Sequence, residues 1–386
     1  MKDDFGSENI QEIAKKILKK GSICNNCLGR NFAHISTGLT NRKRGEILRK
    51  LLKEKKPKHC IICNDLFKNL EKWKKEALKK LKGIDYSSFL VGTKLSQKIL
   101  KNEEDLWEDV GIEYCESIRA EINRELGKLI ERATKKNVDE RTPDINVILN
   151  LQKYEIEIKI NPIFIFGSYK KLARGIPQTR LEGHKKAISD IIAEPILKTT
   201  KGSDYSFHGC GREDIDAKCL DWRPFVLEIF SPKKKPNLKS MKTTINRSKK
   251  ANVSKLSFTE RKKIKEVKKQ KPDKTYRLLT VFEKSVENIE KIKEIRGTIR
   301  QQTPKRVAHR RADIIRMRKV KNIKYKKINN KTYELIIKAE SGLYIKELVT
   351  GDNNRTQPNI SKLLNNKAEV KELDVMRIWY EGKQRV

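Results

Sequence analysis

The sequence lacks a hydrophobic run long enough to cross a membrane, and its start, Met1-Lys2-Asp3-Asp4, does not look like a secretory signal peptide. The His-x-Glu and Pro-Cys-x-x-Cys signatures of zinc-dependent deaminases are absent as well. A methyltransferase would need a glycine-rich nucleotide loop, and the only candidate, Gly209-Cys210-Gly211, is followed by acids instead of a helical pattern. These absences predict a soluble cytoplasmic protein and speak against both enzyme classes.

Acidic residues are few relative to basic ones: 50 Asp and Glu stand against 89 Lys and Arg, a net charge of +39. Such an excess predicts a polyanionic partner, with nucleic acid favoured over a membrane surface. The segment 231–274 alone carries 17 basic and 3 acidic residues. We interpret it as a largely flexible arm along a phosphate backbone, with a hint of a short strand at 253–258. A merely solvated loop is the alternative.

Cysteines are few, but four of the seven stand in two Cys-x-x-Cys pairs separated by 32 residues. Two such pairs can offer four thiolates to a tetrahedral zinc ion, and in a reducing compartment they indicate metal before disulfides. The predicted ligands are Cys24, Cys27, Cys60 and Cys63. Because four thiolates leave no open position for a reacting water, the expected role is structural. Two unrelated free thiol pairs are the alternative, and His34 or His59 could replace one ligand.

The middle of the chain alternates apolar and polar residues with a period of two. Residues 145–151 and 154–160 show this pattern on both sides of Gln152-Lys153, which predicts a hairpin. A short strand at 88–92 and a long helix over 118–130 precede it. We interpret Tyr169 and the basic residues at 170, 171 and 174 as RNA contacts, and Phe164 and Phe166 as core.

The most distinctive stretch is Gly211-Arg212-Glu213-Asp214-Ile215-Asp216-Ala217-Lys218, which follows a glycine-rich turn and precedes an apolar strand at 224–230. A carboxylate on a turn beside a rigid strand can act as a nucleophile or as an acid or base. An adjacent arginine can hold it ionised. A charged surface turn is the alternative interpretation.

Three segments together resemble the archaeal and eukaryotic tRNA pseudouridine synthases known as the Pus-ten family. They are 211–218 with the following Arg223-Pro224-Phe225, then 302–313, then 340–352. The resemblance implies an α+β fold: a mixed, mainly antiparallel pseudouridine-synthase sheet with flanking helices, preceded by a THUMP-like α/β domain and a zinc-binding segment. The expected division is 1–83 for the helical zinc segment, 84–192 for the THUMP-like domain and 193–386 for the catalytic domain.

The resemblance also implies the site and the reaction, which converts uridine to pseudouridine at positions 54 and 55 in the T-loop of tRNA without a cofactor for catalysis. Asp214 is the expected essential carboxylate, and a monomer is expected. The expected substrate-binding residues are Arg212 in the gap left by the flipped nucleotide, Tyr276 against the uracil, Tyr344, the pair Ile345 and Lys346, and Leu373. Lys346 would form a salt bridge with Asp214.

The sequence departs from the family pattern in three places. Lys218 stands where arginine is usual, Leu220-Asp221-Trp222 is shorter than the usual glycine-rich link, and Asn354 replaces a glycine. These changes bear on the loop geometry after Asp214. The competing hypothesis is a non-catalytic, zinc-stabilised tRNA-binding or chaperone protein. It would keep the charge, the THUMP-like module and the zinc, so only Asp214, Tyr276 and Lys346 separate it from the enzyme.

Overall fold

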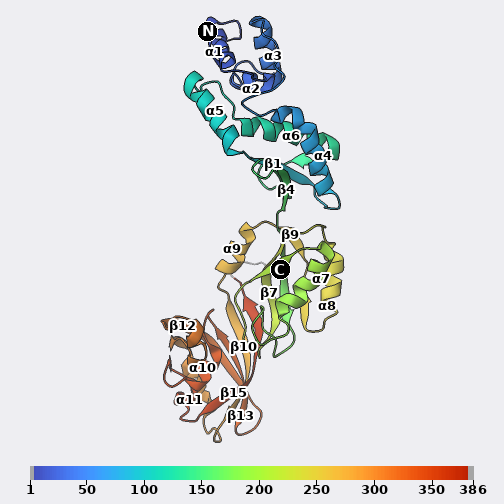
Figure 1. Ribbon diagram of the computed structural model, residues 1–386. Helices are drawn as coiled ribbons and strands as arrows, with labels where there is room; N and C mark the ends of the chain where they lie inside the picture. Colours follow the sequence, from blue (N-terminus) through green and yellow to red (C-terminus); the bar gives the residue numbers. More distant parts are fainter. Residues whose placement is uncertain (1–3, 381–386) are drawn as a thin grey trace. The chain divides into compact units, whose positions relative to one another are not determined.

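The computed structural model of the protein describes residues 4–380 (Figure 1). It divides into two compact units, Met1–Asn161 and Pro162–Val386, and each is described by itself. Among the described residues, no helix combines the length and the apolar character that a membrane crossing requires.

The first unit carries helices on a four-stranded sheet of order β2-β1-β3-β4. One hydrophobic core, which includes Trp73, Phe89 and Leu126, joins the helices to the sheet. Serine or threonine side chains cap four of the helices, which fixes where these helices begin. The elements are α1 (Glu8–Lys19), α2 (Asn25–Arg30), α3 (Asn41–Leu51), α4 (Leu70–Leu81), β1 (Ser88–Lys94), α5 (Gln97–Val110), α6 (Ile118–Thr134), β2 (Asn137–Val138), β3 (Ile145–Asn150) and β4 (Glu155–Ile160).

The predicted hairpin of this unit is confirmed. Strands β3 and β4 pair antiparallel, with Asn150 opposite Glu155 across the turn. Strand β1 is parallel to both of its neighbours, β2 and β3. The predicted long helix is α6, whose apolar residues Ile118, Ile122, Leu126 and Ile130 are fully buried.

The second unit is built on an eleven-stranded sheet of order β14-β11-β12-β13-β10-β15-β7-β5-β8, with β6 on β7 and β9 on β5. Its pairs are antiparallel except β7 with β15, so the expected mixed, mainly antiparallel sheet is confirmed. Its strands are β5 (Ile163–Lys171), β6 (Asp204–Gly209), β7 (Lys218–Phe230), β8 (Ala251–Val253), β9 (Ser257–Thr259), β10 (Asp273–Phe282), β11 (Gly297–Gln302), β12 (Ile315–Lys327), β13 (Thr332–Ala339), β14 (Thr356–Gln357) and β15 (Ala368–Trp379).

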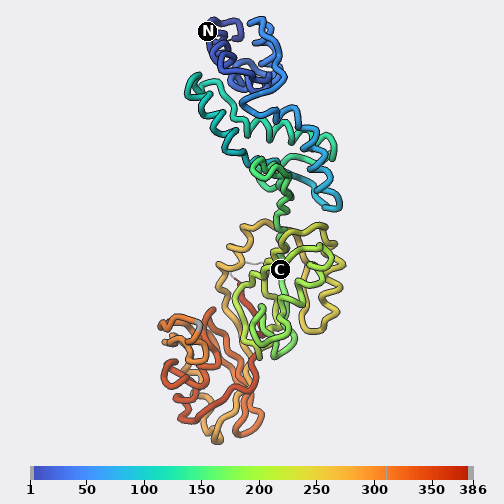
Figure 2. The backbone as a smooth tube through the Cα atoms, in the orientation of Figure 1, coloured from blue at the N-terminus to red at the C-terminus, as the bar shows by residue number. Residues whose placement is uncertain are grey.

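The parallel contact joins two halves of this sheet. Asp374 and Val375 of β15 lie opposite Lys218 and Cys219 of β7, so chain segments far apart in sequence run side by side (Figure 2). Separate hydrophobic clusters fill the two halves. The helices are α7 (Ile188–Thr200), α8 (Leu238–Asn246), α9 (Lys262–Lys269), α10 (Ile345–Thr350) and α11 (Ile360–Leu363), with 3-10 turns at Ile289–Ile295 and Lys305–Arg310.

Two features differ from the sequence-based expectation. Strand β5, which we assigned to the THUMP-like module, pairs with β7 in the second unit. The three-part division at 83/84 and 192/193 stays a prediction. The boundary between the two compact units falls between residues 161 and 162 of the chain. The flexible-arm interpretation of 231–274 is wrong, because this segment forms α8, β8, β9 and α9. Ile245 and Val253 are buried there, and they anchor these elements in spite of the charge.

Candidate active site

Asp214 lies on the loop between β6 and β7. The two strands pair from Asp204 opposite Phe230 to Gly209 opposite Phe225, so the ends of the loop are held together. Gly211 turns the chain with a φ of +75°, a backbone conformation that favours glycine. The loop ends at Lys218, where β7 begins to pair with β15. The carboxylate is therefore presented at the junction of the two halves of the sheet.

Two cations flank the Asp214 carboxylate. Arg306 Nη1 lies 3.1 Å from Oδ1, and Lys346 Nζ lies 4.0 Å from Oδ2. The Asp214 side chain keeps 29% of its surface exposed, so a reactant can still reach it. The Lys346 ammonium is closer to Asp216, at 2.6 Å from Oδ2. Although burial opposes this effect, Lys346 holds the pKa of Asp216 below its ordinary value. The expected partner of Asp214 is thus present, but Arg306 is nearer.

Arg306 is itself anchored from the other side. Its Nε donates to Oε1 of Glu347 at 2.6 Å, and Glu347 is buried at the start of α10. Burial opposes the charge on Arg306, yet the hydrogen bonds to Glu347 keep the pKa of the guanidinium above its ordinary value. Sequence reasoning missed Arg306 and Glu347 as site residues. Both residues lie in segments on which the family resemblance rests, so the sequence could have marked them as candidates. It could not show that the two side chains contact each other.

Tyr344 precedes α10 and is fixed by a buried amide. Gln301 accepts from the backbone N–H of Tyr344 at 2.8 Å and donates to its carbonyl at 3.0 Å. Arg311 donates to the phenol oxygen of Tyr344 at 3.1 Å, and the Arg306 guanidinium lies 5.9 Å from its ring centre. Ile345 is buried behind it. The half-buried Tyr344 ring therefore has two arginines near it, and one of them, Arg306, also pairs with Asp214.

Tyr276 and Leu373 come from adjacent strands, β10 and β15, which pair with Leu278 opposite Leu373. Both side chains are buried in the core cluster of this half. Burial raises the pKa of Tyr276 well above its ordinary value, and the negative charge of Asp214 acts in the same direction. Arg212 is exposed on the loop itself.

A buried ion pair lies behind the loop. Arg223 Nη2 is 3.2 Å from Oε2 of Glu213, and both side chains are almost fully buried. The hydroxyl of Tyr169 donates to Oε1 of Glu213 at 3.1 Å, and Gln178 donates to that hydroxyl at 2.6 Å. Burial, together with the charge of Arg223, lowers the pKa of Lys274 to about 8. Glu213 thus faces the interior while its neighbour Asp214 faces the partly exposed side.

The expectation that Tyr169 and Lys171 contact RNA is wrong, while the same expectation for Lys170 and Arg174 stays a prediction. Tyr169 and Lys171 have no exposed surface, because the inward face of β5 packs beneath the Asp214 loop. Arg174 is engaged in ion pairs with Glu372 and Asp374. Lys170 points the other way, with its ammonium 4.6 Å from the centre of the Trp222 ring. The sequence pattern of this segment did not show which side chains the fold covers.

Two of the three departures from the family pattern, the short link and Asn354, have local structural explanations. The short link Leu220-Asp221-Trp222 is part of β7, and Asp221 accepts from the backbone N–H of Ile378 in β15 at 2.8 Å. Asn354 has a φ of +66°, in a run of left-handed residues that begins at Gly351. Asparagine tolerates this conformation better than most side chains.

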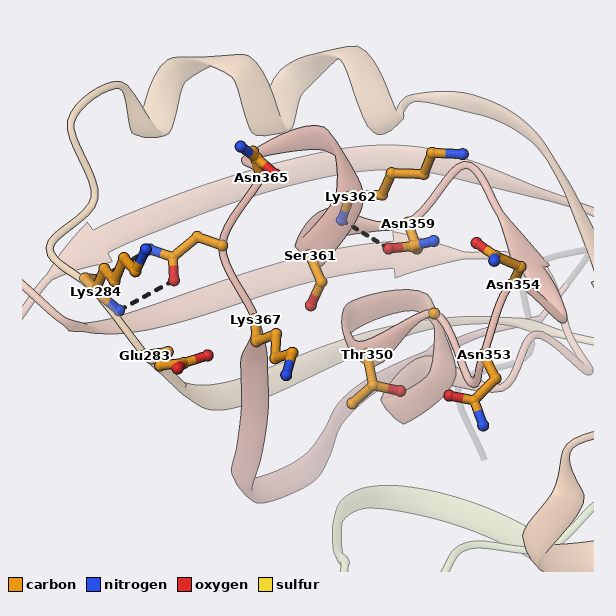
Figure 3. Close-up of a pocket in the computed structure, with 12 residues that line it drawn as sticks. Glu283, Lys284, Thr350, Asn353, Asn354, Asn359, Ser361, Lys362, Asn365 and Lys367 are labelled. Carbon is orange, nitrogen blue, oxygen red and sulfur yellow. Dashed lines mark hydrogen bonds between the residues drawn. The ribbon is translucent and has the colours of Figure 1, made fainter.

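A polar hollow lies at the C-terminal end of α10 (Figure 3). Asn353, Asn354, Asn365 and three lysines surround it, and Asn359 accepts from the backbone N–H of Lys362 at 2.9 Å. Among the residues that the structure describes, its lining includes none of those predicted for the site. The hollow is therefore separate from the Asp214 constellation.

In the first unit, the two cysteine pairs meet. The four Sγ atoms lie within 4.8 Å of one another, with 3.8 Å between those of Cys24 and Cys63. A tetrahedron with Zn–S bonds of about 2.3 Å has sulfur atoms roughly 3.8 Å apart, so the spacing fits a metal ion. His59 is hydrogen-bonded to Asp65 at 2.6 Å, which leaves the four thiols as the ligand set. This cluster could hold a metal ion.

Comparisons with known proteins agree over almost the whole chain. Two family models match it, "Pus10, C-terminal" over residues 164–379 and "Pus10 THUMP domain, archaeal" over residues 73–150. The tRNA pseudouridine synthase Pus10 of Pyrococcus furiosus is 39% identical over 382 residues, covering 96% of this chain and 98% of that protein. The protein of the same name from Methanocaldococcus jannaschii is 38% identical over 436 residues, covering 96% and 95%. Among solved structures, a Cbf5-Nop10-Gar1 complex is similar with a TM-score of 0.35 and 20% identity, covering 56% of this chain and 50% of that one.

Proposed function

The chain belongs to the Pus10 family of tRNA pseudouridine synthases, and from this membership we propose that it isomerises uridine to pseudouridine at positions 54 and 55 in the T-loop of tRNA, with Asp214 as the essential carboxylate. The observation that carries the role of Asp214 is its setting. It is a partly exposed carboxylate on a tightly held loop, between Arg306 and Lys346. The non-catalytic alternative gives no reason for such an arrangement.

The reaction breaks the C1′–N1 bond of uridine and forms a C1′–C5 bond within the same nucleotide. The proton lost from C5 is balanced by one gained at N1, so no oxidant, reductant or group donor is consumed. A carboxylate can attack the sugar or the base, or move the proton, and Asp214 takes this role. Arg306 and Lys346, which flank it, hold the carboxylate in position.

The remaining residues bind the flipped nucleotide. Extruding a base costs a few kcal/mol, less in a loop, and pocket contacts offset that cost. Tyr276 supplies the aromatic face against the uracil, and Leu373 and Ile345 supply apolar walls. Tyr344, whose ring lies near Arg306 and Arg311, is a second aromatic side chain for binding the nucleotide. Arg212, exposed on the loop, fills the gap that the nucleotide leaves.

Binding of the tRNA T-arm rests on charge and on the THUMP domain matched at residues 73–150. With a net charge of +39, a large part of the affinity comes from phosphate contacts and falls steeply with salt. The protein acts as a monomer in the cytoplasm. We keep a zinc segment at 1–83 and a THUMP-like domain from residue 84, but we move the start of the catalytic domain from 193 to 162, because β5 pairs with β7.

The proposal includes a structural zinc ion bound by the four cysteines. We expect about one zinc per chain, and we expect Cys27→Ser or removal of the metal by a chelator to lower the Tm of the first unit by roughly 10 °C or more. Losing four thiolate bonds costs several kcal/mol, and each kcal/mol moves the Tm of a domain of this size by roughly 2–4 °C. Calorimetry with metal analysis measures both quantities. Cys115→Ser, outside the cluster, is the matched control, and a chain without stoichiometric metal whose Tm ignores the chelator would contradict this assignment.

The experiment that tests the function is a pseudouridine assay on an unmodified tRNA transcript without added cofactor. Transcripts with a single uridine replaced at position 54 or 55 show which site reacts, and binding is measured in parallel. Formation of pseudouridine in the T-loop supports the proposal. Tight binding without pseudouridine on any transcript would instead leave the tRNA-binding or chaperone alternative.

A further inference from the structure

Lys171, at the end of β5, is a lysine with no exposed surface and no carboxylate in hydrogen-bond contact among the described residues. Its ammonium donates instead to two backbone carbonyls of the Asp214 loop, at 3.0 Å to Asp214 and 2.7 Å to Ile215. Both hydrogen bonds of this ammonium therefore go to backbone carbonyls of the Asp214 loop, and one of these carbonyls belongs to the residue proposed to react.

Arg174 continues the same pattern three residues later. Its Nη1 donates to the carbonyl of Asp216 at 2.9 Å and to the carbonyl of Leu373 at 3.0 Å. Its Nη2 donates to Oδ2 of the buried Asp374 at 2.9 Å. The backbone N–H of Gly175 also donates to Ile215, at 3.0 Å. Three consecutive carbonyls, at 214, 215 and 216, therefore all accept from the segment 171–175.

Packing alone does not require a lysine at position 171. A buried ammonium is unfavourable, and burial lowers the pKa of Lys171 although nearby carboxylates oppose the shift. A methionine of similar length would fill the same space without that desolvation penalty. What methionine cannot do is donate to the carbonyls and hold the loop in one conformation. The contacts of Lys171 thus determine loop position more than they contribute stability.

We propose that Lys171 and Arg174 form a clamp that sets the position of the Asp214 carboxylate and, through Arg174, ties it to the strand that bears Leu373. Both are positioning residues, since they touch the backbone and not the reacting groups. The inference rests on the proposed role of Asp214. A carboxylate fixed through its own carbonyl has little freedom to drift, and a misplacement of about 1 Å can cost about a hundredfold in rate.

The test compares Lys171→Met and Arg174→Gln with the wild type in single-turnover pseudouridine formation and in tRNA binding. We expect the rate at saturating tRNA to fall about 10- to 100-fold, with Kd within about twofold in the same buffer. Hydrogen exchange of the amides at 215–217 should become faster in both variants. Lys331→Met, at an exposed turn position, is the matched control and should change none of these quantities.

The outcomes separate the hypotheses. An unchanged rate in a folded variant, or a raised Kd with an unchanged rate, would overturn the clamp, the latter in favour of a direct RNA contact. If Lys171→Met does not fold, Arg174→Gln decides, because the Arg174 side chain is 28% exposed and its replacement leaves the core filled. Arg174→Lys, which keeps the charge but offers fewer donors, should recover part of the rate. An inactive wild type would instead refute the proposed function itself.

Discussion

Asp214→Asn is expected to lower the rate of pseudouridine formation at saturating tRNA by about 10³-fold or more, while the Kd for tRNA stays within about threefold. Asparagine keeps the shape of the side chain but cannot act as a nucleophile or accept a proton in the same way, and such groups contribute roughly 10²–10⁴ in rate or more. The flanking cations Arg306 and Lys346 remain, so the pocket keeps its attraction for a polyanion. Rapid-quench kinetics with parallel binding measurements check both quantities.

The neighbouring carboxylate provides the matched control. Asp216 also pairs with Lys346, at 2.6 Å, and Asp216→Asn makes the same chemical change two residues away. We expect it to lower the rate far less than Asp214→Asn. If Asp216→Asn abolishes the reaction and Asp214→Asn does not, the roles of the two aspartates must be exchanged. If neither variant affects the rate, the reaction does not depend on this loop.

Arg223→Met is expected to lower the free energy of unfolding of the second unit by about 3–5 kcal/mol. It would leave Glu213 as a buried charge without its partner, and breaking a buried ion pair from one side costs about that much. The hydrogen bonds from Tyr169 to Glu213 remain, but a neutral donor compensates an ionised carboxylate only in part. Urea unfolding followed by circular dichroism measures the change.

A double-mutant cycle separates the loss of the Glu213–Arg223 ion pair from the loss of side-chain packing at position 223. Glu213→Gln combined with Arg223→Met should be less destabilising than the sum of the single changes, because no unpaired charge is left inside. Lys262→Met, which removes an exposed ion pair with Glu260, is the surface control and should leave the unfolding curve nearly unchanged. A loss of stability for Arg223→Met no larger than that of the control would show that the buried pair is not needed.

Several parts of the protein follow from the sequence because the signal is local. The hairpin at β3 and β4 is predicted by a period of two around a short turn. The cluster of four cysteines is predicted by two Cys-x-x-Cys pairs, since each pair already places two thiols together. The long motif around Asp214 identifies the loop of interest through its family resemblance. In each case the signal is a short motif whose residues lie within a few positions of one another, even where two such motifs are far apart along the chain.

The sequence by itself therefore predicted a polyanionic partner, the grouping of the four cysteines, the β3–β4 hairpin and the position of the candidate carboxylate. Only the tertiary structure decided which groups surround that carboxylate. Arg306, Lys346 and Lys171 reach the Asp214 loop from three separate segments, and β5 lies in the second unit because it pairs with β7. Strand pairing and burial depend on contacts between distant segments. A strand pattern with two similar faces does not specify which face is covered, so the buried role of Lys171 could not be seen in the sequence.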